Sequence, residues 1–360
     1  MHRIAPTTFW YNLKTMNKTI SRRDFLKLAG LGLTGLAFSP YVHPGDSLSE
    51  TGKLVRVAIH SVSVYAQPNE KSRILFQHFR DEVVNVYYEV ISPYGPGYNP
   101  LWYRVWGGYM HCARLQVVEM RENPVVSDIP KSGLLAEVTV PFTQAMLPSG
   151  KSWQEVYRLY YSTTHWIIAL DQGPDGGPWY RLRDELTEIE YHVPASHLRI
   201  IPPDELTPLS PDVPADQKRI EVSVPRQMLT AYEGDKIVLQ TTICTGVFSS
   251  DRSLNGVATS TPLGDWRVIS KMPSKHMGSG MLTNDPEEYV LVGVPWTTFF
   301  HVTGVAFHGT YWHNNFGTPM SRGCVNMRTP EAKWLFRWTT PVAAPEEVEK
   351  RGYGTTVSVV

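Results

Sequence analysis

Residues 304–327 read GVAFHGTYWHNNFGTPMSRGCVNM, and this stretch indicates both a fold and a chemistry. It places His308 directly before a glycine and, sixteen residues later, Cys324 directly after another. A thiol is a poor nucleophile until it loses its proton, so a catalytic cysteine needs a nearby imidazole as base. Gly309 and Gly323 lack side chains, so backbone groups there can approach a substrate and the imidazole. The stretch predicts that Cys324 is a nucleophile and that His308 is its general base.

The same stretch resembles the signature of the L,D-transpeptidase catalytic domain. That signature is a His, a spacer, then Ser or Thr, His, Gly, Cys, an apolar residue, and Asn or Arg. The matching residues in this chain are His308, Ser321, Arg322, Gly323, Cys324, Val325 and Asn326. Four further segments resemble the family's turns, substrate-side loops and last strand: Thr261–Gly264, Met272–Ser274, Gly293–Trp296 and Gly354–Val359. The resemblance covers residues 219–360 and implies a β-sandwich-like catalytic domain at 218–360.

The resemblance also implies a reaction and its substrate. In that family the cysteine attacks a carbonyl of a peptidoglycan stem peptide, at a diamino acid, and expels the terminal D-alanine. An amine of a neighbouring stem then resolves the acyl-enzyme, and no cofactor takes part. By this resemblance the Gly309 carbonyl orients the imidazole of His308, and backbone N–H groups near Gly323 and Cys324 hold the oxyanion, with Ser321 beside them.

Four residues are expected to contact the stem peptide: Trp296, Tyr311, Trp312 and Asn326. For the two aromatic residues that follow the base, packing in the core is an equally good interpretation, since large aromatic side chains fill cores as readily as sites.

Arg322 stands where the family often has a second histidine. Arginine does not deprotonate in proteins, so it cannot act as a base. Two hypotheses follow: its fixed charge lowers the pKa of Cys324, or it binds a carboxylate of the substrate.

The composition favours a mainly β protein with no affinity for nucleic acid. Lys plus Arg and Asp plus Glu are equal at 34 each, so no net charge attracts nucleic acid or an anionic membrane. The 28 prolines and 27 glycines fall between short runs rich in Val, Ile, Tyr and Thr, which is typical of many short strands. A length of 360 residues indicates two or three domains, and it does not define an oligomeric state.

The first 45 residues are predicted to be an export signal with a linker. Basic residues precede an apolar stretch at 28–38, and its 11 residues are too few for a bilayer span of roughly 20. Residues 21–27, SRRDFLK, resemble the twin-arginine motif, which directs folded proteins to the export machinery. The mature chain is therefore expected outside the cytoplasm, in the cell envelope or a periplasm-like space. An amphipathic helix of the mature protein is the alternative.

Two segments, 50–122 and 132–203, look like copies of one module. WYRV at 102–105 recurs as WYRL at 179–182, and each copy opens with alternating, strand-like sequence. Small twisted barrels suit that pattern. The first copy resembles a bacterial Src-homology-3-like barrel, a module that often binds cell-wall peptide or glycan, and the second resembles it less. The alternative is that the tryptophans of both copies are simply core residues.

Five prolines between 202 and 214 predict a stiff, extended linker at 204–217 rather than a packed element. Beyond it, Arg219 onward reads as a hairpin that opens the catalytic domain. After the cysteine, Thr329 is expected to be the N-cap and Pro330 the first residue of a short helix with Trp334, Leu335 and Trp338 on its apolar face.

Three rival interpretations remain. His301, His308, His313 and Cys324 could bind zinc, although their spacing matches no helical zinc motif. A carboxypeptidase would resolve the same acyl-enzyme with water. A wall-binding protein with an inactive last domain would leave the pair of Cys324 and His308 without a purpose. The other two cysteines, Cys112 and Cys244, lie in strand-like segments and are expected to be buried and inert.

Overall fold

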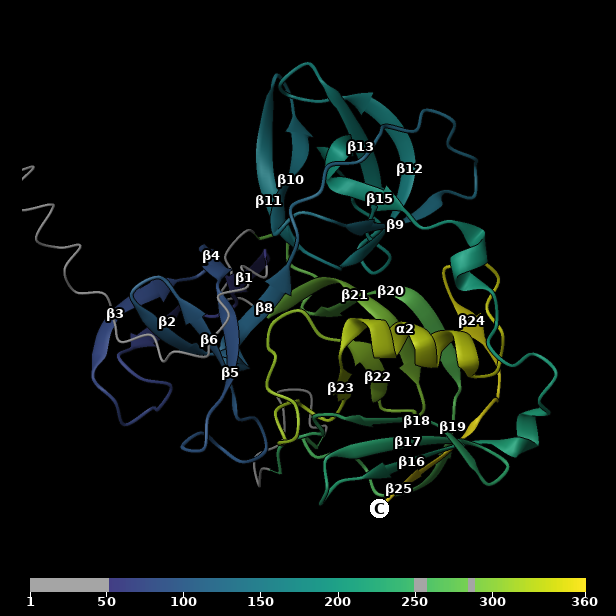
Figure 1. Cartoon of the computed structure of the whole chain (residues 1–360). Coiled ribbons are helices and arrows are strands. Elements are labelled where there is room, and N and C mark those ends of the chain that lie inside the picture. The colour runs from purple at the N-terminus through teal and green to yellow at the C-terminus, as the bar shows by residue number, and fades with distance from the viewer. Residues whose placement is uncertain (1–51, 249–257, 284–288) are drawn as a thin grey trace, which may run out of the picture. The chain divides into compact units, whose positions relative to one another are not determined.

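The computed structural model describes residues 52–248, 258–283 and 289–360, and they form a mainly β protein with one α-helix among them (Figure 1). The mainly β prediction is confirmed. The export signal predicted at residues 1–45 lies outside the described residues. Within the described ranges, no helix has the length and apolar character needed to cross a membrane.

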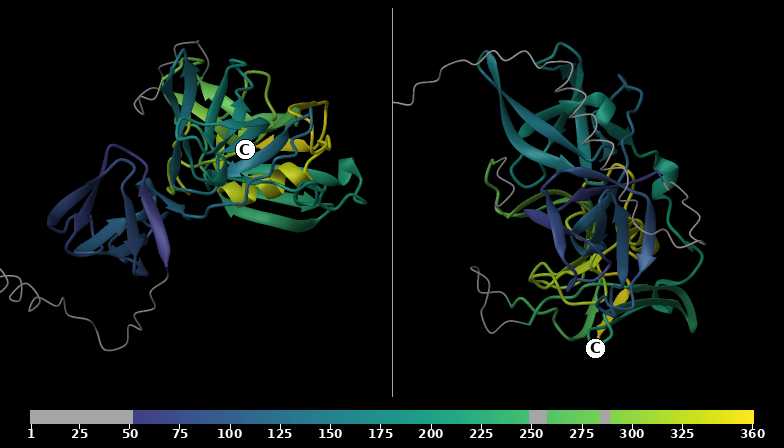
Figure 2. Two further views of the ribbon diagram at one scale, coloured as in Figure 1. Left: turned by 90° about the horizontal axis from the view of Figure 1, so that it is seen from above. Right: turned by 60° about the vertical axis from the view of Figure 1, so that its left-hand side comes forward.

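Residues 53–118 form two sheets around one apolar core (Figure 2). The smaller sheet has the order β4-β1-β8 and the larger has the order β3-β2-β7-β6-β5. Valines that alternate along β1 and β4 point into the core, together with Tyr103 and Met110. Trp102 is completely buried and Trp106 is 72% exposed, so one of the two tryptophans is a core residue. The strands of this first β module are β1 (Lys53–Val57), β2 (Ser61–Tyr65), β3 (Ile74–Phe79), β4 (Val83–Val86), β5 (Tyr88–Ile91), β6 (Leu101–Val105), β7 (Gly108–His111) and β8 (Leu115–Val118).

The second β module, residues 134–200, is a single seven-stranded sheet in the order β11-β10-β14-β13-β12-β9-β15. Its neighbouring strands pair antiparallel, and its core includes Tyr157, Ile167, Tyr180 and Tyr191. That both modules are Src-homology-3-like stays a prediction. The strands are β9 (Leu134–Val138), β10 (Phe142–Ser149), β11 (Ser152–Tyr160), β12 (Thr164–Gln172), β13 (Pro178–Arg183), β14 (Glu190–Pro194) and β15 (Leu198–Ile200).

The last part of the chain consists of two five-stranded sheets and the helix α2 (Thr329–Trp338). One sheet has the order β18-β17-β16-β25-β19, and the other has the order β23-β22-β21-β20-β24. Their strands are β16 (Lys218–Ser223), β17 (Met228–Glu233), β18 (Lys236–Thr242), β19 (Gly264–Arg267), β20 (Ser270–Gly278), β21 (Val290–Phe299), β22 (Ala306–Gly309), β23 (Val325–Met327), β24 (Lys350–Arg351) and β25 (Thr356–Val359).

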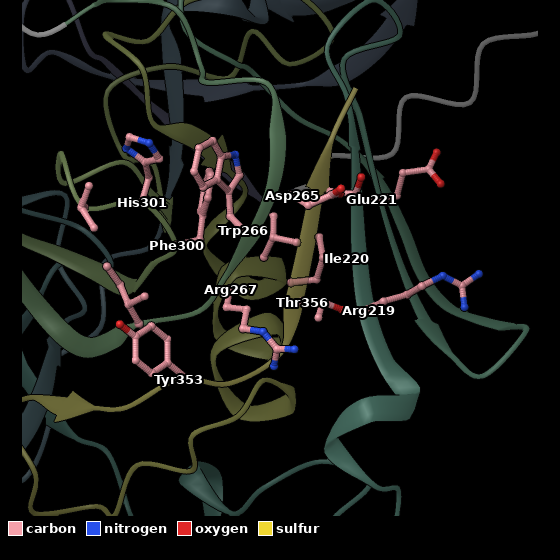
Figure 3. A pocket seen from close by; sticks show the side chains of 14 residues that line it. Arg219, Ile220, Glu221, Asp265, Trp266, Arg267, Phe300, His301, Tyr353 and Thr356 are labelled. Carbon is pink, nitrogen blue, oxygen red and sulfur yellow. The ribbon is translucent and has the colours of Figure 1, made fainter.

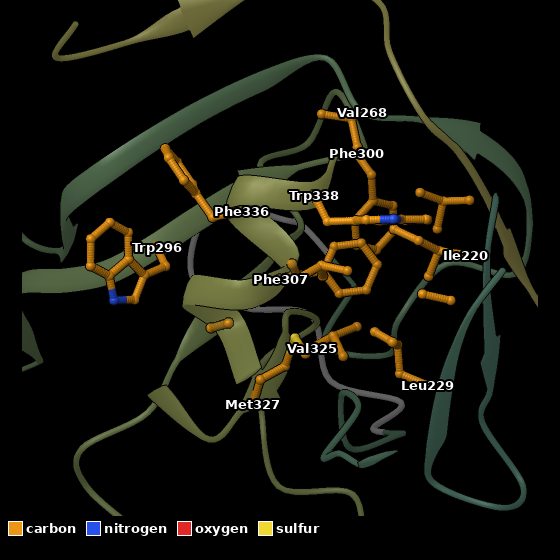
Figure 4. Close-up of a cluster of buried hydrophobic side chains, with 14 of the residues drawn as sticks. Ile220, Leu229, Val268, Trp296, Phe300, Phe307, Val325, Met327, Phe336 and Trp338 are labelled. Carbon is orange, nitrogen blue, oxygen red and sulfur yellow. The ribbon is translucent and has the colours of Figure 1, made fainter. Parts of the chain in front are cut away.

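Side chains from both sheets and from the helix meet in one hydrophobic core (Figure 4). Ile220 and Leu229 come from the first sheet, Phe307 and Val325 from the second, and Trp338 from the helix. The helix begins at Thr329, with Arg328 as its N-cap and Pro330 in its first turn, one residue earlier than the sequence predicts. Its buried residues are Ala332, Leu335, Phe336 and Trp338, so Trp334 lies at the edge of the predicted apolar face.

The segment between the second module and the last part is packed, which corrects the prediction of a free extended linker. Leu206 is buried in the same core as Ile220, and the carboxylate of Glu205 accepts hydrogen bonds from Arg199 and Lys333. Two short 3-10 turns, η4 (Pro203–Leu206) and η5 (Ala215–Gln217), replace an extended chain. The number of prolines suggested an extended chain. The segment packs because Leu206 enters the core and Glu205 forms ion pairs.

The second β module packs on the hairpin of β20 and β21. Thr164 Oγ1 donates to the Pro273 carbonyl at 2.7 Å, and Ser274 Oγ donates back to the Thr164 carbonyl. At Gly293, a Cβ atom would lie 2.3 Å from the ring of His165, so only glycine allows this approach. Leu135 and Trp166 of the module also belong to the core of the last part. The two parts therefore share buried surface.

A buried carboxylate anchors this contact. Asp184 Oδ2 lies 2.7 Å from Nδ1 of His276 on β20, and Asp184 Oδ1 accepts the backbone N–H of Thr187 at 2.8 Å. Both side chains of the Asp184–His276 pair are 1% exposed. Burial alone would raise the pKa of Asp184, but the hydrogen bonds from His276 and Thr187 hold it below its usual value.

We expect Asp184→Ala to lower the free energy of unfolding by about 3 kcal/mol at neutral pH, because it leaves Nδ1 of His276 and the Thr187 N–H without a partner. The depressed pKa means that this contribution is present above about pH 4 and is lost as the pH falls through the folded-state pKa. Denaturant unfolding measures this change in the free energy of unfolding. As a control, Glu89→Ala removes an exposed ion pair with Lys53 and should change stability by less than about 1 kcal/mol. Equal effects of the two variants would contradict the prediction.

Candidate active site

The parallel pairing of β22 with β23 puts the predicted base and nucleophile on one face of the sheet. His308 is paired with Asn326 and Phe307 with Val325, so Cys324 comes level with Ala306. Side chains alternate along a strand, and Phe307 and Val325 point into the core. His308 and Cys324 therefore point to the opposite side, two positions apart along the strands. That the two residues act as nucleophile and base stays a prediction.

The imidazole of His308 is held in one tautomer. Its Nδ1 lies 3.0 Å from the Gly309 carbonyl oxygen, which can only accept, so Nδ1 carries the proton and Nε2 is left as the base. Only 2% of His308 is exposed, and burial lowers its pKa to about 4. The ring of Trp312 covers it at a centroid distance of 5.6 Å. The contact is the one predicted for Gly309, and its catalytic role stays a prediction.

Cys324 is the only partly exposed cysteine, since Cys112 and Cys244 are buried as predicted. Its Sγ lies 3.8 Å from the Gly304 carbonyl. Burial raises the pKa of the thiol, and a hydrogen bond from the Ala306 backbone offsets part of that rise. Burial also lowers the pKa of His308, so both groups are held in their neutral forms near pH 7.

Arg322 lies at the exposed edge of the site. Its guanidinium carbon is 4.6 Å from the centre of the Tyr289 ring. Burial raises the pKa of Tyr289, the charge of Cys324 adds to that effect, and the charge of Arg322 opposes it. The three groups are therefore neighbours. Both hypotheses for Arg322, an effect on the pKa of Cys324 and the binding of a substrate carboxylate, stay predictions.

The loop that carries the nucleophile is held by Ser321. The Ser321 hydroxyl donates to the Cys324 carbonyl and accepts the N–H of Gly323 at 3.2 Å. Gly323 has φ of +113°, a conformation that residues with a side chain rarely adopt. The Gly323 N–H is thus occupied, which differs from the expectation that it helps to hold the oxyanion.

Three of the four expected substrate contacts are buried in the structure. Trp296, 1% exposed, packs on Phe336 of the helix in the core, with φ of +61°. Asn326, 2% exposed, donates through Nδ2 to His313. Their packing is that of core residues, so it does not favour contact with a substrate. Of the four, Trp312 has the partly exposed side chain, and it lies beside the base.

Tyr311 reveals a contact that the sequence did not indicate. Its carbonyl accepts a hydrogen bond from Arg56 of the first β module at 3.2 Å, and its ring stacks on Tyr160 of the second. Arg56 is 1% exposed and is also bonded to Asp81 at 2.7 Å. Both modules therefore support the segment that follows the base. These partners are up to 255 residues apart, so no local pattern could have found them.

Two other candidates for a ligand site are the possible metal ligands and a surface cavity. Among the described residues, no three His, Cys, Asp or Glu side chains are grouped to hold a metal ion. His313 instead contacts Asn326, and His301 packs on Trp266. A cavity of about 640 Å³ lies between β16, β19 and β25 and is lined by Trp266 and His301 among others (Figure 3). None of the predicted site residues lines it.

The two-sheet domain thus carries a histidine on one of two paired parallel strands and a cysteine directly before the other. Residues 217–359 match the model of the YkuD family, the L,D-transpeptidase catalytic domain. The match falls on the segment for which the sequence implies this resemblance.

Solved structures similar to the chain have low identity to it. An L,D-transpeptidase of Xylanimonas cellulosilytica is 23% identical, with 40% of this chain and 60% of that chain covered and a TM-score of 0.28. A cysteine-to-serine mutant of the Enterococcus faecium enzyme is 23% identical, with 40% and 50% covered and a TM-score of 0.29. An L,D-transpeptidase from Mycobacterium smegmatis is 15% identical, with 68% and 90% covered and a TM-score of 0.30. The chain thus spans 50–60% of the first two proteins. No curated protein matches it.

We expect the rate at which iodoacetamide alkylates Cys324 to keep rising beyond pH 9, because burial raises the pKa of its thiol above that value. Mass spectrometry of peptides measures the rate at each pH. Cys112 and Cys244 are internal controls, since burial raises the pKa of both to about 12. A plateau at neutral pH would indicate a preformed ion pair and contradict the assignment of two neutral groups.

Proposed function

We propose that this protein is a peptidoglycan L,D-transpeptidase that cross-links stem peptides through Cys324. The observation that carries the proposal is the pairing of β22 and β23, with the tautomer of His308 fixed by the Gly309 carbonyl. The match of residues 217–359 to the L,D-transpeptidase catalytic domain supports it.

In the proposed acylation step, Sγ of Cys324 attacks the carbonyl carbon of the diamino acid while its proton passes to Nε2 of His308. The resulting oxyanion collapses, and the bond from that carbon to the nitrogen of D-alanine breaks. The proton on Nε2 moves to the leaving amine, which departs as D-alanine. A thioester on Cys324 remains.

In the second step, the amine of another stem peptide attacks the thioester carbonyl and gives a proton to His308. The bond between carbon and sulfur breaks, and the proton returns to sulfur. The lowered pKa of His308 suits this shuttle, since the imidazole is neutral and ready to accept a proton at pH 7.

The substrate lies outside the cytoplasm, so the proposal requires export. We infer that the twin-arginine-like segment at residues 21–27 provides it. The two β modules are proposed to support the enzyme, because Arg56 and Tyr160 hold the segment around Tyr311.

The mature protein should convert disaccharide-tetrapeptide into cross-linked dimers and D-alanine, as followed by mass spectrometry. We expect Cys324→Ser and His308→Ala each to lower the rate by about a thousandfold or more, because the two residues act as a unit. Cys112→Ala and His78→Ala, which change the same residue types in the first module, should retain activity. Tripeptide without dimers would identify a carboxypeptidase, and no product at all would favour a wall-binding protein.

Arg322→Ala should raise KM for the tetrapeptide by about tenfold with a smaller change in kcat, because a charged hydrogen bond to a substrate carboxylate is worth about 1.5–3 kcal/mol. Arg322→Lys should retain part of the affinity, and Arg226→Ala, which removes another exposed arginine, should have no effect. An unchanged KM in Arg322→Ala would exclude carboxylate binding by this residue.

A further inference from the structure

The hydroxyl of Thr261 joins two backbone segments beside the nucleophile. Its Oγ1 accepts the N–H of Gly246 at 2.8 Å and lies 2.8 Å from the carbonyl oxygen of Gly323. A carbonyl can only accept, and a hydroxyl has one proton, so Thr261 donates that proton to Gly323. Thr261 is 5% exposed, which protects both hydrogen bonds from competition with water.

The segment around Gly246 is built for this close approach. A Cβ atom at Gly246 would lie 2.1 Å from the Thr259 carbonyl oxygen and 2.8 Å from the Cα atom of Gly323. Gly246 and Ser321 form an isolated parallel bridge, and the N–H of Val247 donates to the Ser321 carbonyl at 2.9 Å. The nucleophile loop thus rests against a fixed strand-like segment, with Thr261 as the polar link between them.

The contact fixes the direction of one particular N–H group. The peptide bond between Gly323 and Cys324 is planar, and in the trans form its carbonyl and its N–H point in opposite directions. Because the Thr261 hydroxyl holds the Gly323 carbonyl, the N–H of Cys324 points away from Thr261.

The neighbouring main-chain groups of Gly323 and Cys324 already have partners. Ser321 accepts the Gly323 N–H and donates to the Cys324 carbonyl. Within the part of the chain that the structure describes, the N–H of Cys324 donates to no acceptor. Of the N–H groups of these two residues, that of Cys324 therefore remains for an oxyanion formed on a carbonyl that Sγ attacks.

We propose that Thr261 is a positioning residue that aims the Cys324 N–H at the oxyanion. The inference rests on the proposed function, since it needs a tetrahedral intermediate at Cys324. Loss of the Thr261 hydroxyl weakens stabilisation of the transition state and leaves ground-state binding of the donor stem peptide unchanged.

Thr261→Val should lower kcat for D-alanine release by about ten- to a hundredfold with KM unchanged, less than the 10²–10³ typical when an oxyanion donor is removed outright. Alkylation of Cys324 by iodoacetamide should keep its rate, because displacement at a saturated carbon forms no oxyanion. Thr261→Ser keeps the hydroxyl and should keep kcat. Thr259→Val is the matched control: that hydroxyl donates to the Val247 carbonyl in the same region at 2.9 Å and should not affect either rate.

Equal losses of acylation and alkylation in Thr261→Val would indicate a merely structural role and overturn the inference, as would an unchanged kcat. If wild-type protein releases no D-alanine, the proposed function itself fails, which is a distinct outcome.

A second measurement uses wild-type protein and does not depend on a variant that folds. Full-length, nitrogen-15-labelled protein is treated with imipenem, whose strained cyclic amide can acylate a thiol. The amide resonance of Cys324 should shift strongly as its N–H bonds the acyl oxygen, and that of Gly323 should shift little. A strong shift of Gly323 with none at Cys324 would overturn the inference.

Discussion

The parallel hydrogen bonding between β22 and β23 is the constraint on which the active site depends. It joins two segments separated by the loop at residues 310–324 and decides which side chains share a face. Phe307, Val325 and Met327 then fill the core, and the alternate positions hold the predicted catalytic residues. A shift of one residue in this register would exchange the two sets, placing the imidazole in the hydrophobic core and taking hydrophobic side chains out of it. The burial energy of the core therefore also maintains the site.

The low pKa of His308 and the raised pKa of Cys324 have one common cause, which is burial. The ring of Trp312 lies beside the imidazole, and burial leaves neither charged form favoured near pH 7. A resting neutral pair is less reactive toward incidental electrophiles than a free thiolate is. Hydrogen bonds to a charge that develops in such a buried site are stronger than they are in water.

The sequence predicted the elements that local chemistry defines. Thr329 and Pro330 marked the start of the helix, because the N–H that proline lacks has no helical partner at that position. Gly309 and Gly323 marked close approaches of the backbone that a side chain would hinder. Local patterns were less informative where distant residues decide the packing. Trp296, an expected substrate contact, packs on Phe336, and that expectation stays a prediction. The prolines at 202–214 indicated a stiff, extended linker, but Leu206 is buried by residues that come later in the chain. The charge of Arg56 gave no sign of the carbonyl that it binds 255 residues away.

Residues 49–360 form one compact unit, although the sequence divides them into three modules. Leu135 and Trp166 lie in the same hydrophobic core as Ile220 and Phe307, so the second module and the catalytic domain are not separable pieces. Cutting the chain after residue 217 would expose a hydrophobic surface on each fragment, at the place where each part now covers the other. Such a module can be exchanged only if the surface of the neighbouring domain that covers it changes at the same time. The unit on which selection acts here is larger than the segment that a family signature outlines.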